Sequence, residues 1–128
     1  MIDVLADLIS KLILSLNQQK EYELYRDLAP HDSQLTGCAI NQAGNKIFTS
    51  GYDSTSKIWS VDTGDWLNCF KGHSDYISCF ALSFPFEDKL ATGSYDCSVK
   101  VWSTETGNLL QNLSGHSQEI VFVKFWIM

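Results

Sequence analysis

The sequence predicts an all-β fold made of repeated units, preceded by one short helix. Residues 48–60 read FTSGYDSTSKIWS, and residues 91–103, a step of 43 further on, read ATGSYDCSVKVWS. Short runs rich in β-branched and aromatic residues alternate with turn residues, which is typical of all-β proteins. A Gly-His pair recurs at the same step, at residues 72–73 and 115–116.

Apolar residues near the start of the chain follow helical spacing. Asp3 and Asp7 are unlike the positively charged start of a secretory signal, and polar residues from Ser10 onward interrupt the stretch too early for a membrane span of about 20 residues. We therefore predict an amphipathic helix over residues 1–19 that docks on another surface. Its apolar positions are Ile2, Leu5, Ile9, Leu12 and Leu16.

The rest of the chain, residues 20–128, is predicted to form strands separated by turns. A first strand is expected over 21–28. The two repeated units are expected to hold four strands each, at 35–40, 46–50, 55–60 and 66–70, and at 77–84, 89–94, 99–103 and 109–113. Residues 119–128 are expected to form the first strand of a third unit.

A period of about 40 to 45 residues, with Gly-His near the start of each unit and a Trp-Asp-like pair near its end, is the signature of four-stranded propeller blades. In this chain Trp59-Ser60 and Trp102-Ser103 stand at the Trp-Asp position. The sequence therefore resembles the WD-repeat family over residues 21–128. The resemblance implies a partial WD-repeat β-propeller of about two blades plus part of a third.

The resemblance also implies a hydrogen-bonded tetrad in each blade. An Asp in a tight turn accepts from a His, the His engages a Thr hydroxyl, and the Thr meets an indole N–H, because buried polar groups need partners. Pro30 replaces the family's Gly before the first His, and His116 has no Asp or Trp of its own unit. The two sets are His31, Thr49, Asp53 and Trp59, and His73, Thr92, Asp96 and Trp102.

A His, a hydroxyl and an Asp could also suggest acyl-transfer catalysis. Thr is a poor substitute for a Ser nucleophile, and the set recurs once per unit, as structural residues do. The sequence has no Gly-rich phosphate loop and no metal-binding spacing. The sequence therefore predicts no enzyme, metal site or cofactor. Four cysteines are expected to be small apolar residues in a reduced cytosol: Cys38, Cys69, Cys79 and Cys97.

By the same resemblance, residues before the tight-turn Asp and at the start of the first strand lie on one rim of the propeller. Tyr is favoured at interaction hot spots, which predicts partner binding there; alternatively, Tyr52 and Tyr95 only pack over their turns. A net charge of −6, with nine scattered basic residues, argues against nucleic acid and favours basic partner surfaces. The predicted partner-binding residues are Tyr52, Tyr95, Asp75, Tyr76, Gln118 and Glu119.

Residues 22–53 and 72–110 are similar to WD-repeat factors that assemble outer-arm axonemal dyneins and act as ciliary cargo adaptors. That resemblance implies an interaction scaffold in the cytoplasm and in the cilium or flagellum, with dynein-arm or intraflagellar transport components as partners. A generic WD-repeat adaptor, such as a ubiquitin ligase substrate receptor, and a truncated fragment without function are the alternatives. We also expect self-association, because an incomplete ring leaves strand edges open.

Overall fold

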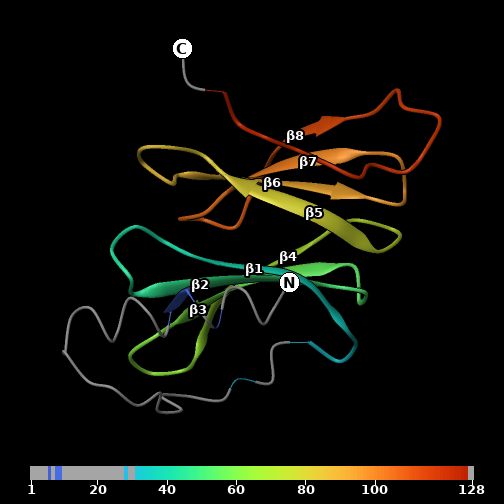
Figure 1. Cartoon of the computed structure of the whole chain (residues 1–128). Coiled ribbons are helices and arrows are strands. Elements are labelled where there is room, and N and C mark those ends of the chain that lie inside the picture. The colour runs from blue at the N-terminus through green and yellow to red at the C-terminus, as the bar shows by residue number, and fades with distance from the viewer. Residues whose placement is uncertain (1–5, 7, 10–27, 29–30, 127–128) are drawn as a thin grey trace.

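The computed structural model describes residues 6, 8–9, 28 and 31–126 of the 128-residue chain. In this part the strands form two four-stranded antiparallel sheets, each in chain order. Figure 1 shows the two sheets stacked one on the other. The all-β prediction is therefore confirmed. The first sheet contains β1 (Leu35–Ile40), β2 (Lys46–Gly51), β3 (Thr55–Ser60) and β4 (Trp66–Lys71), and the second contains β5 (Ile77–Leu82), β6 (Lys89–Ser94), β7 (Val99–Ser103) and β8 (Leu109–Leu113).

Equivalent turns have the same backbone conformation in both sheets. Gly64 and Gly107, each between the third and fourth strand of its sheet, have φ angles of 78° and 79°. Ser54 and Cys97, each directly after a tight-turn Asp, have φ angles of 68° and 69°. Glycine adopts this left-handed region without the steric penalty of a side chain. The recurrence of Gly at positions 64 and 107 is therefore explained by the left-handed backbone conformation of this turn.

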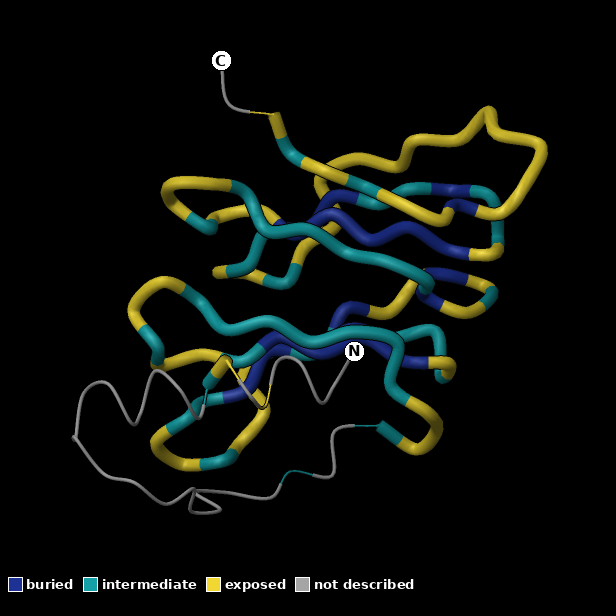
Figure 2. The backbone as a smooth tube through the Cα atoms, in the orientation of Figure 1, coloured by how far each residue is buried: buried dark blue, intermediate teal, exposed yellow. Residues whose placement is uncertain are grey.

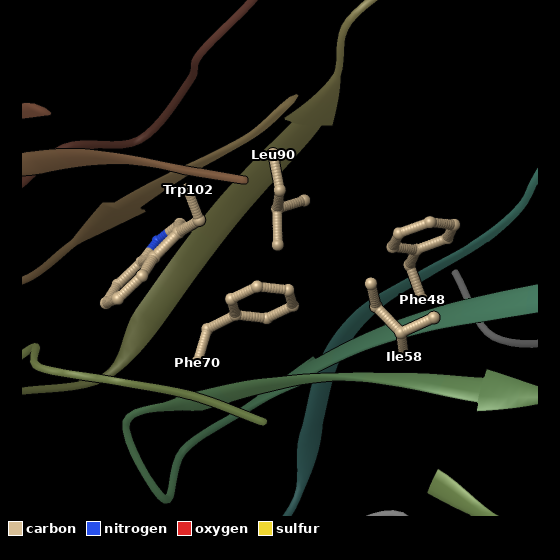
Figure 3. Close-up of a cluster of buried hydrophobic side chains, with 5 residues drawn as sticks. All are labelled: Phe48, Ile58, Phe70, Leu90 and Trp102. Carbon is tan, nitrogen blue, oxygen red and sulfur yellow. The ribbon is translucent and has the colours of Figure 1, made fainter. Parts of the chain in front are cut away.

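The core lies between the two sheets, where each sheet buries one face against the other. Phe48, Ile58 and Phe70 of the first sheet pack with Leu90 and Trp102 of the second (Figure 3). The ring centroids of Phe70 and Trp102 are 5.6 Å apart. Figure 2 shows that the buried residues follow the central strands of both sheets. Full burial of each such side chain contributes about 1.5 to 3 kcal/mol, so this cluster holds the sheets together.

The fifth strand is shorter than expected. It was predicted to span residues 77–84, but β5 ends at Leu82. Ser83 instead begins the turn into β6, where its hydroxyl accepts a hydrogen bond from the Lys89 N–H at 3.0 Å. Phe84 and Phe86, which flank Pro85 in this turn, are exposed. The side-chain hydrogen bond and the proline therefore end the strand two residues early.

The predicted first strand of a third unit is not formed over residues 119–126. Ile120 is buried and its N–H donates to Ser94 O at 3.0 Å, whereas Val121, Phe122 and Trp126 are exposed. A strand requires a ladder of hydrogen bonds to a neighbour. Within residues 31–126, no strand pairs with this stretch. Ile120 is therefore its one fully buried side chain within residues 119–126, and the stretch stays outside both sheets.

The N-terminal predictions fall mostly outside the described residues. Of the helix predicted over 1–19, only Ala6, Leu8 and Ile9 are described, and these three are helical. Of the strand predicted over 21–28, only Leu28 is described, and it is not in a strand. The boundary between residues 1–19 and 20–128 remains a prediction. Where the structure describes the chain, none of its helical residues belongs to a helix of the length and apolar character that crossing a bilayer requires.

Candidate partner-binding rim and the tetrads beneath it

The second sheet contains a chain of four hydrogen-bonded side chains. The carboxylate of Asp96 can only accept, so His73 Nδ1 donates to Asp96 Oδ2, at 2.8 Å. His73 Nε2 lies 2.7 Å from Thr92 Oγ1. Trp102 Nε1 donates to the same oxygen at 2.9 Å. His73, Thr92 and Trp102 are buried, so each hydrogen bond satisfies a polar group that water does not reach.

The first sheet repeats this arrangement with nearly the same distances. His31 Nδ1 lies 2.8 Å from Asp53 Oδ2, and His31 Nε2 lies 2.9 Å from Thr49 Oγ1. Trp59 Nε1 donates to Thr49 Oγ1 at 2.9 Å. The structure thus brings the eight predicted residues together as two sets of four. Each set runs from the tight turn at the rim to the tryptophan inside the sheet.

Each tetrad has a fifth member, a hydroxyl group, that the sequence analysis missed. Thr55 Oγ1 donates to Asp53 Oδ1 at 2.8 Å, and Ser98 Oγ donates to Asp96 Oδ1 at 2.6 Å. The backbone N–H groups of Thr55 and Ser98 donate to the same carboxylate oxygens. The available signal was the spacing, since a hydroxyl two residues after an Asp is the pattern of an Asx-type turn.

These donors set the ionisation of the two aspartates. Burial raises the pKa of Asp96, but hydrogen bonds from Ser98 and His73 and from the Ser98 and Ser74 N–H groups outweigh it and lower the pKa from 3.8 to about 2. For Asp53, burial also raises the pKa, but donors on Thr55 and His31 lower it overall. Both carboxylates are therefore ionised at neutral pH.

The second Gly-His pair, at residues 115–116, does not build a tetrad. His116 is exposed, whereas His73, its counterpart 43 residues earlier, is buried. The exposure of His116 therefore fits the expectation that the third tetrad is incomplete.

Above the tetrads, three of the predicted partner-binding residues form one aromatic cluster. Tyr52 follows β2, Tyr76 precedes β5, and Tyr95 lies between β6 and β7. The ring centroids of Tyr52 and Tyr76 are 4.6 Å apart, and those of Tyr76 and Tyr95 are 5.7 Å apart. Their exposed fractions are 41%, 44% and 45%. These three residues, the tyrosine rim, therefore contact one another across both sheets and still present almost half of their surface to solvent.

The other three predicted residues lie around this cluster. Asp75 is partly buried, and its Oδ1 accepts a hydrogen bond from the Tyr76 N–H at 2.8 Å. Gln118 and Glu119 are exposed and directly precede Ile120, whose N–H donates to Ser94 O next to Tyr95. They thus lie beside the turn that carries Tyr95, without joining the cluster of tilted rings.

A groove of about 430 Å³ lies between the inner strands β1 and β5 and the exposed residues Val121 and Phe122. Cys38 and Cys79 line it, and burial raises the pKa of both thiols. A thiol with a raised pKa is a weak nucleophile, so these cysteines are packing residues. Across the described ranges, no three His, Cys, Asp or Glu side chains gather in a way that could hold a metal ion.

The comparisons with known proteins agree with this geometry. The family model described as "WD domain, G-beta repeat" matches residues 22–60 and 64–103. The chain belongs to the WD-repeat family. Among solved structures, this WD-repeat chain is similar to the one titled "Structure of U3-55K", with a TM-score of 0.69 and 25% identity, over 73% of this chain and 30% of the other.

Curated relatives of this WD-repeat protein include "Dynein assembly factor with WD repeat domains 1". The human protein is 38% identical over 77 residues, covering 60% of this chain and 19% of the relative. The Danio rerio protein is 39% identical over 85 residues, covering 65% and 20%. Rat "Apoptotic protease-activating factor 1" is 34% identical over 58 residues, covering 45% and 5%. The chain thus spans about a fifth of the length of the dynein assembly factors.

Proposed function

We propose that the chain is an interaction scaffold in the assembly or ciliary transport of outer-arm axonemal dynein. The observation that carries the proposal is the similarity to relatives named for dynein assembly, at 38% and 39% identity in human and Danio rerio. In this proposal the protein acts in the cytoplasm and in the cilium or flagellum. Dynein-arm or intraflagellar transport components are the proposed partners.

The partner-binding surface in this proposal is the tyrosine rim with its neighbours Asp75, Gln118 and Glu119. Half-exposed tyrosines combine a large contact area with few rotatable bonds, and tyrosine is enriched at interaction hot spots. The two tetrads support the turns that carry Tyr52 and Tyr95, and WD-repeat proteins are typically scaffolds without catalytic activity. We therefore propose a structural role for the tetrads and no enzymatic activity for the chain.

A tagged pull-down from ciliated cells tests this function. The chain should enrich outer-arm dynein or intraflagellar transport subunits, and a variant with both Tyr52→Ala and Tyr95→Ala should lose most of the enrichment. A second variant lacking residues 1–19 tests whether the predicted helix contributes. The matched control is Phe86→Ala, which removes an exposed aromatic ring at the opposite end of β5.

The identity of the recovered proteins decides between the possible roles. Ubiquitin ligase subunits in place of dynein subunits would favour a substrate receptor. Chaperones alone would indicate a fragment without a function of its own. Equal dynein recovery by the parent and the double tyrosine variant would place the partner site away from the tyrosine rim.

A further inference from the structure

We propose that the tyrosine rim binds a cationic segment of a partner protein, with an arginine or lysine side chain placed against the tyrosine rings. This inference rests on the proposed scaffold function, because it concerns the same surface. It adds the chemical class of the partner. Ring geometry, the distribution of charge and the protein's own lysine contacts each support it.

The ring geometry leaves aromatic faces available. The planes of Tyr52 and Tyr76 are tilted by 51°, as are those of Tyr76 and Tyr95. Tilted rings do not cover one another's faces completely, so part of each face meets solvent. A cation within about 6 Å of such a ring is attracted by the negative potential of its face. A long basic side chain can therefore lie along the cluster and contact more than one ring.

The protein already uses this interaction elsewhere. Lys57 Nζ lies 5.8 Å from the ring centroid of Trp59 and 6.0 Å from that of Trp66. Lys124 Nζ lies 5.7 Å from the Trp126 centroid. Over residues 31–126, these lysine contacts involve tryptophans and none involves a tyrosine of the rim. In the proposal, the cation at the tyrosine rim therefore comes from another molecule.

The charge at this end of the sheets favours a cation as well. Asp75 adjoins Tyr76. Within residues 31–126, two lysines supply positive charge there: Lys71, exposed at the end of β4, and Lys100, whose side chain lies beside Gly72. Because Asp53 and Asp96 have lowered pKa values, they remain negative at neutral pH. The carboxylates at this end attract a basic segment and repel an acidic one. They are Asp32, Asp53, Asp75, Asp96 and Glu119.

Fluorescence anisotropy with the purified full chain tests the inference. Two labelled peptides of equal length are compared, one containing arginine and lysine and the other with glutamine at those positions. We expect tighter binding of the basic peptide, and a loss of this preference as salt is raised, because salt screens exposed charges. Asp75→Asn should weaken binding of the basic peptide while it keeps an oxygen that can accept from the Tyr76 N–H.

Ring variants separate aromatic contact from simple charge attraction. Tyr76→Leu should weaken binding of the basic peptide roughly two- to five-fold, as expected for loss of one exposed cation–π contact. Tyr76→Phe keeps the ring and should bind as the parent does. Tyr52→Leu and Tyr95→Leu provide the same test if Tyr76→Leu does not fold, which thermal unfolding shows. Phe86→Leu is the control and should leave binding unchanged.

Equal affinity for the two peptides, absence of binding, or equal losses in Tyr76→Leu and Tyr76→Phe would each overturn the inference. The pull-down separates this result from the proposed function. If dynein subunits are recovered but the basic peptide is not preferred, the proposed scaffold function is supported and the proposed cationic ligand is rejected. If the basic peptide binds in a way that depends on the rings but no dynein subunits are recovered, the cationic ligand is supported. The partner would then be a protein other than the dynein subunits.

Discussion

The tight-turn aspartates are the residues on which each blade depends. Asp96 accepts from His73, from the hydroxyl and N–H of Ser98, and from the N–H of Ser74. Asp96→Ala would leave the buried His73 Nδ1 without this acceptor, and an unsatisfied buried polar group costs about 1 to 3 kcal/mol. We expect the free energy of unfolding to fall by that amount, as measured by urea denaturation.

The control for this prediction is Asp65→Ala. Asp65 is exposed, and the hydrogen bonds described for it use its backbone atoms. Its replacement should change the free energy of unfolding by less than about 0.5 kcal/mol. An Asp96→Ala protein as stable as the Asp65→Ala protein would show that the tetrad does not stabilise the blade.

The lowered pKa of Asp96 predicts acid sensitivity. Its pKa is about 2 in the folded protein and 3.8 ordinarily, so the folded state favours the ionised form. The stabilisation is fully present above the unfolded pKa, and is lost as the pH falls from there through about 2. Melting temperatures between about pH 5 and pH 2 should therefore drop less steeply in Asp96→Asn than in the parent. Parallel curves would contradict the prediction.

At the scale of elements, Ile120 is the main anchor of the segment after β8, through its buried side chain and through the hydrogen bonds of its backbone to Ser94 and Ser78. Ile120 Cγ2 approaches the backbone of Gly93 so closely that it lies 2.6 Å from where a Cβ would stand on that residue. Ile120→Ala should destabilise the protein by about 2 kcal/mol, because it leaves a cavity in a buried contact. The neighbouring exposed Val121→Ala should change stability by less than about 0.5 kcal/mol. Equal effects in chemical denaturation would show that Ile120 is not the anchor.

The eight paired strands could be predicted because each follows local apolar patterning and is bounded by turn residues. The tetrad positions followed from a repeated family motif. Residues 119–126 have the same local pattern, but strand formation also requires a neighbour, which local sequence does not reveal. The contact of Tyr76 with both Tyr52 and Tyr95 depends on how two sheets are placed, and the sequence predicted only that the three residues share a rim.

At the scale of the molecule, one face of the second sheet is left without a cover. Phe70 and Leu113 are equivalent residues, 43 positions apart, yet Phe70 is 1% exposed and Leu113 is 51% exposed. The second sheet covers Phe70, and no described sheet covers Leu113. Exposed apolar surface next to an open strand edge promotes pairing with other chains. We therefore expect the 128-residue chain to self-associate with increasing concentration in sedimentation experiments.

Two leucines of β8 test this expectation. Leu113→Ser should reduce self-association because it makes the uncovered face polar. Leu110→Ser should have a smaller effect. Leu110 is 49% exposed, and its counterpart Leu67 is also 49% exposed although the second sheet covers the first. This position is therefore outside the surface that one sheet presents to the next. A parent chain that stays monomeric at every concentration would refute the expectation.

The buried tryptophans of the two tetrads can also serve as fluorescent probes of folding. Trp59 and Trp102 are buried, one in each sheet, whereas Trp66 and Trp126 are exposed. Replacing the two exposed tryptophans with phenylalanine would leave one shielded indole per sheet as the source of fluorescence. Further replacement of either remaining indole would give a pair of proteins whose emission reports on a single sheet. Their unfolding curves would show whether the two sheets melt together or one after the other.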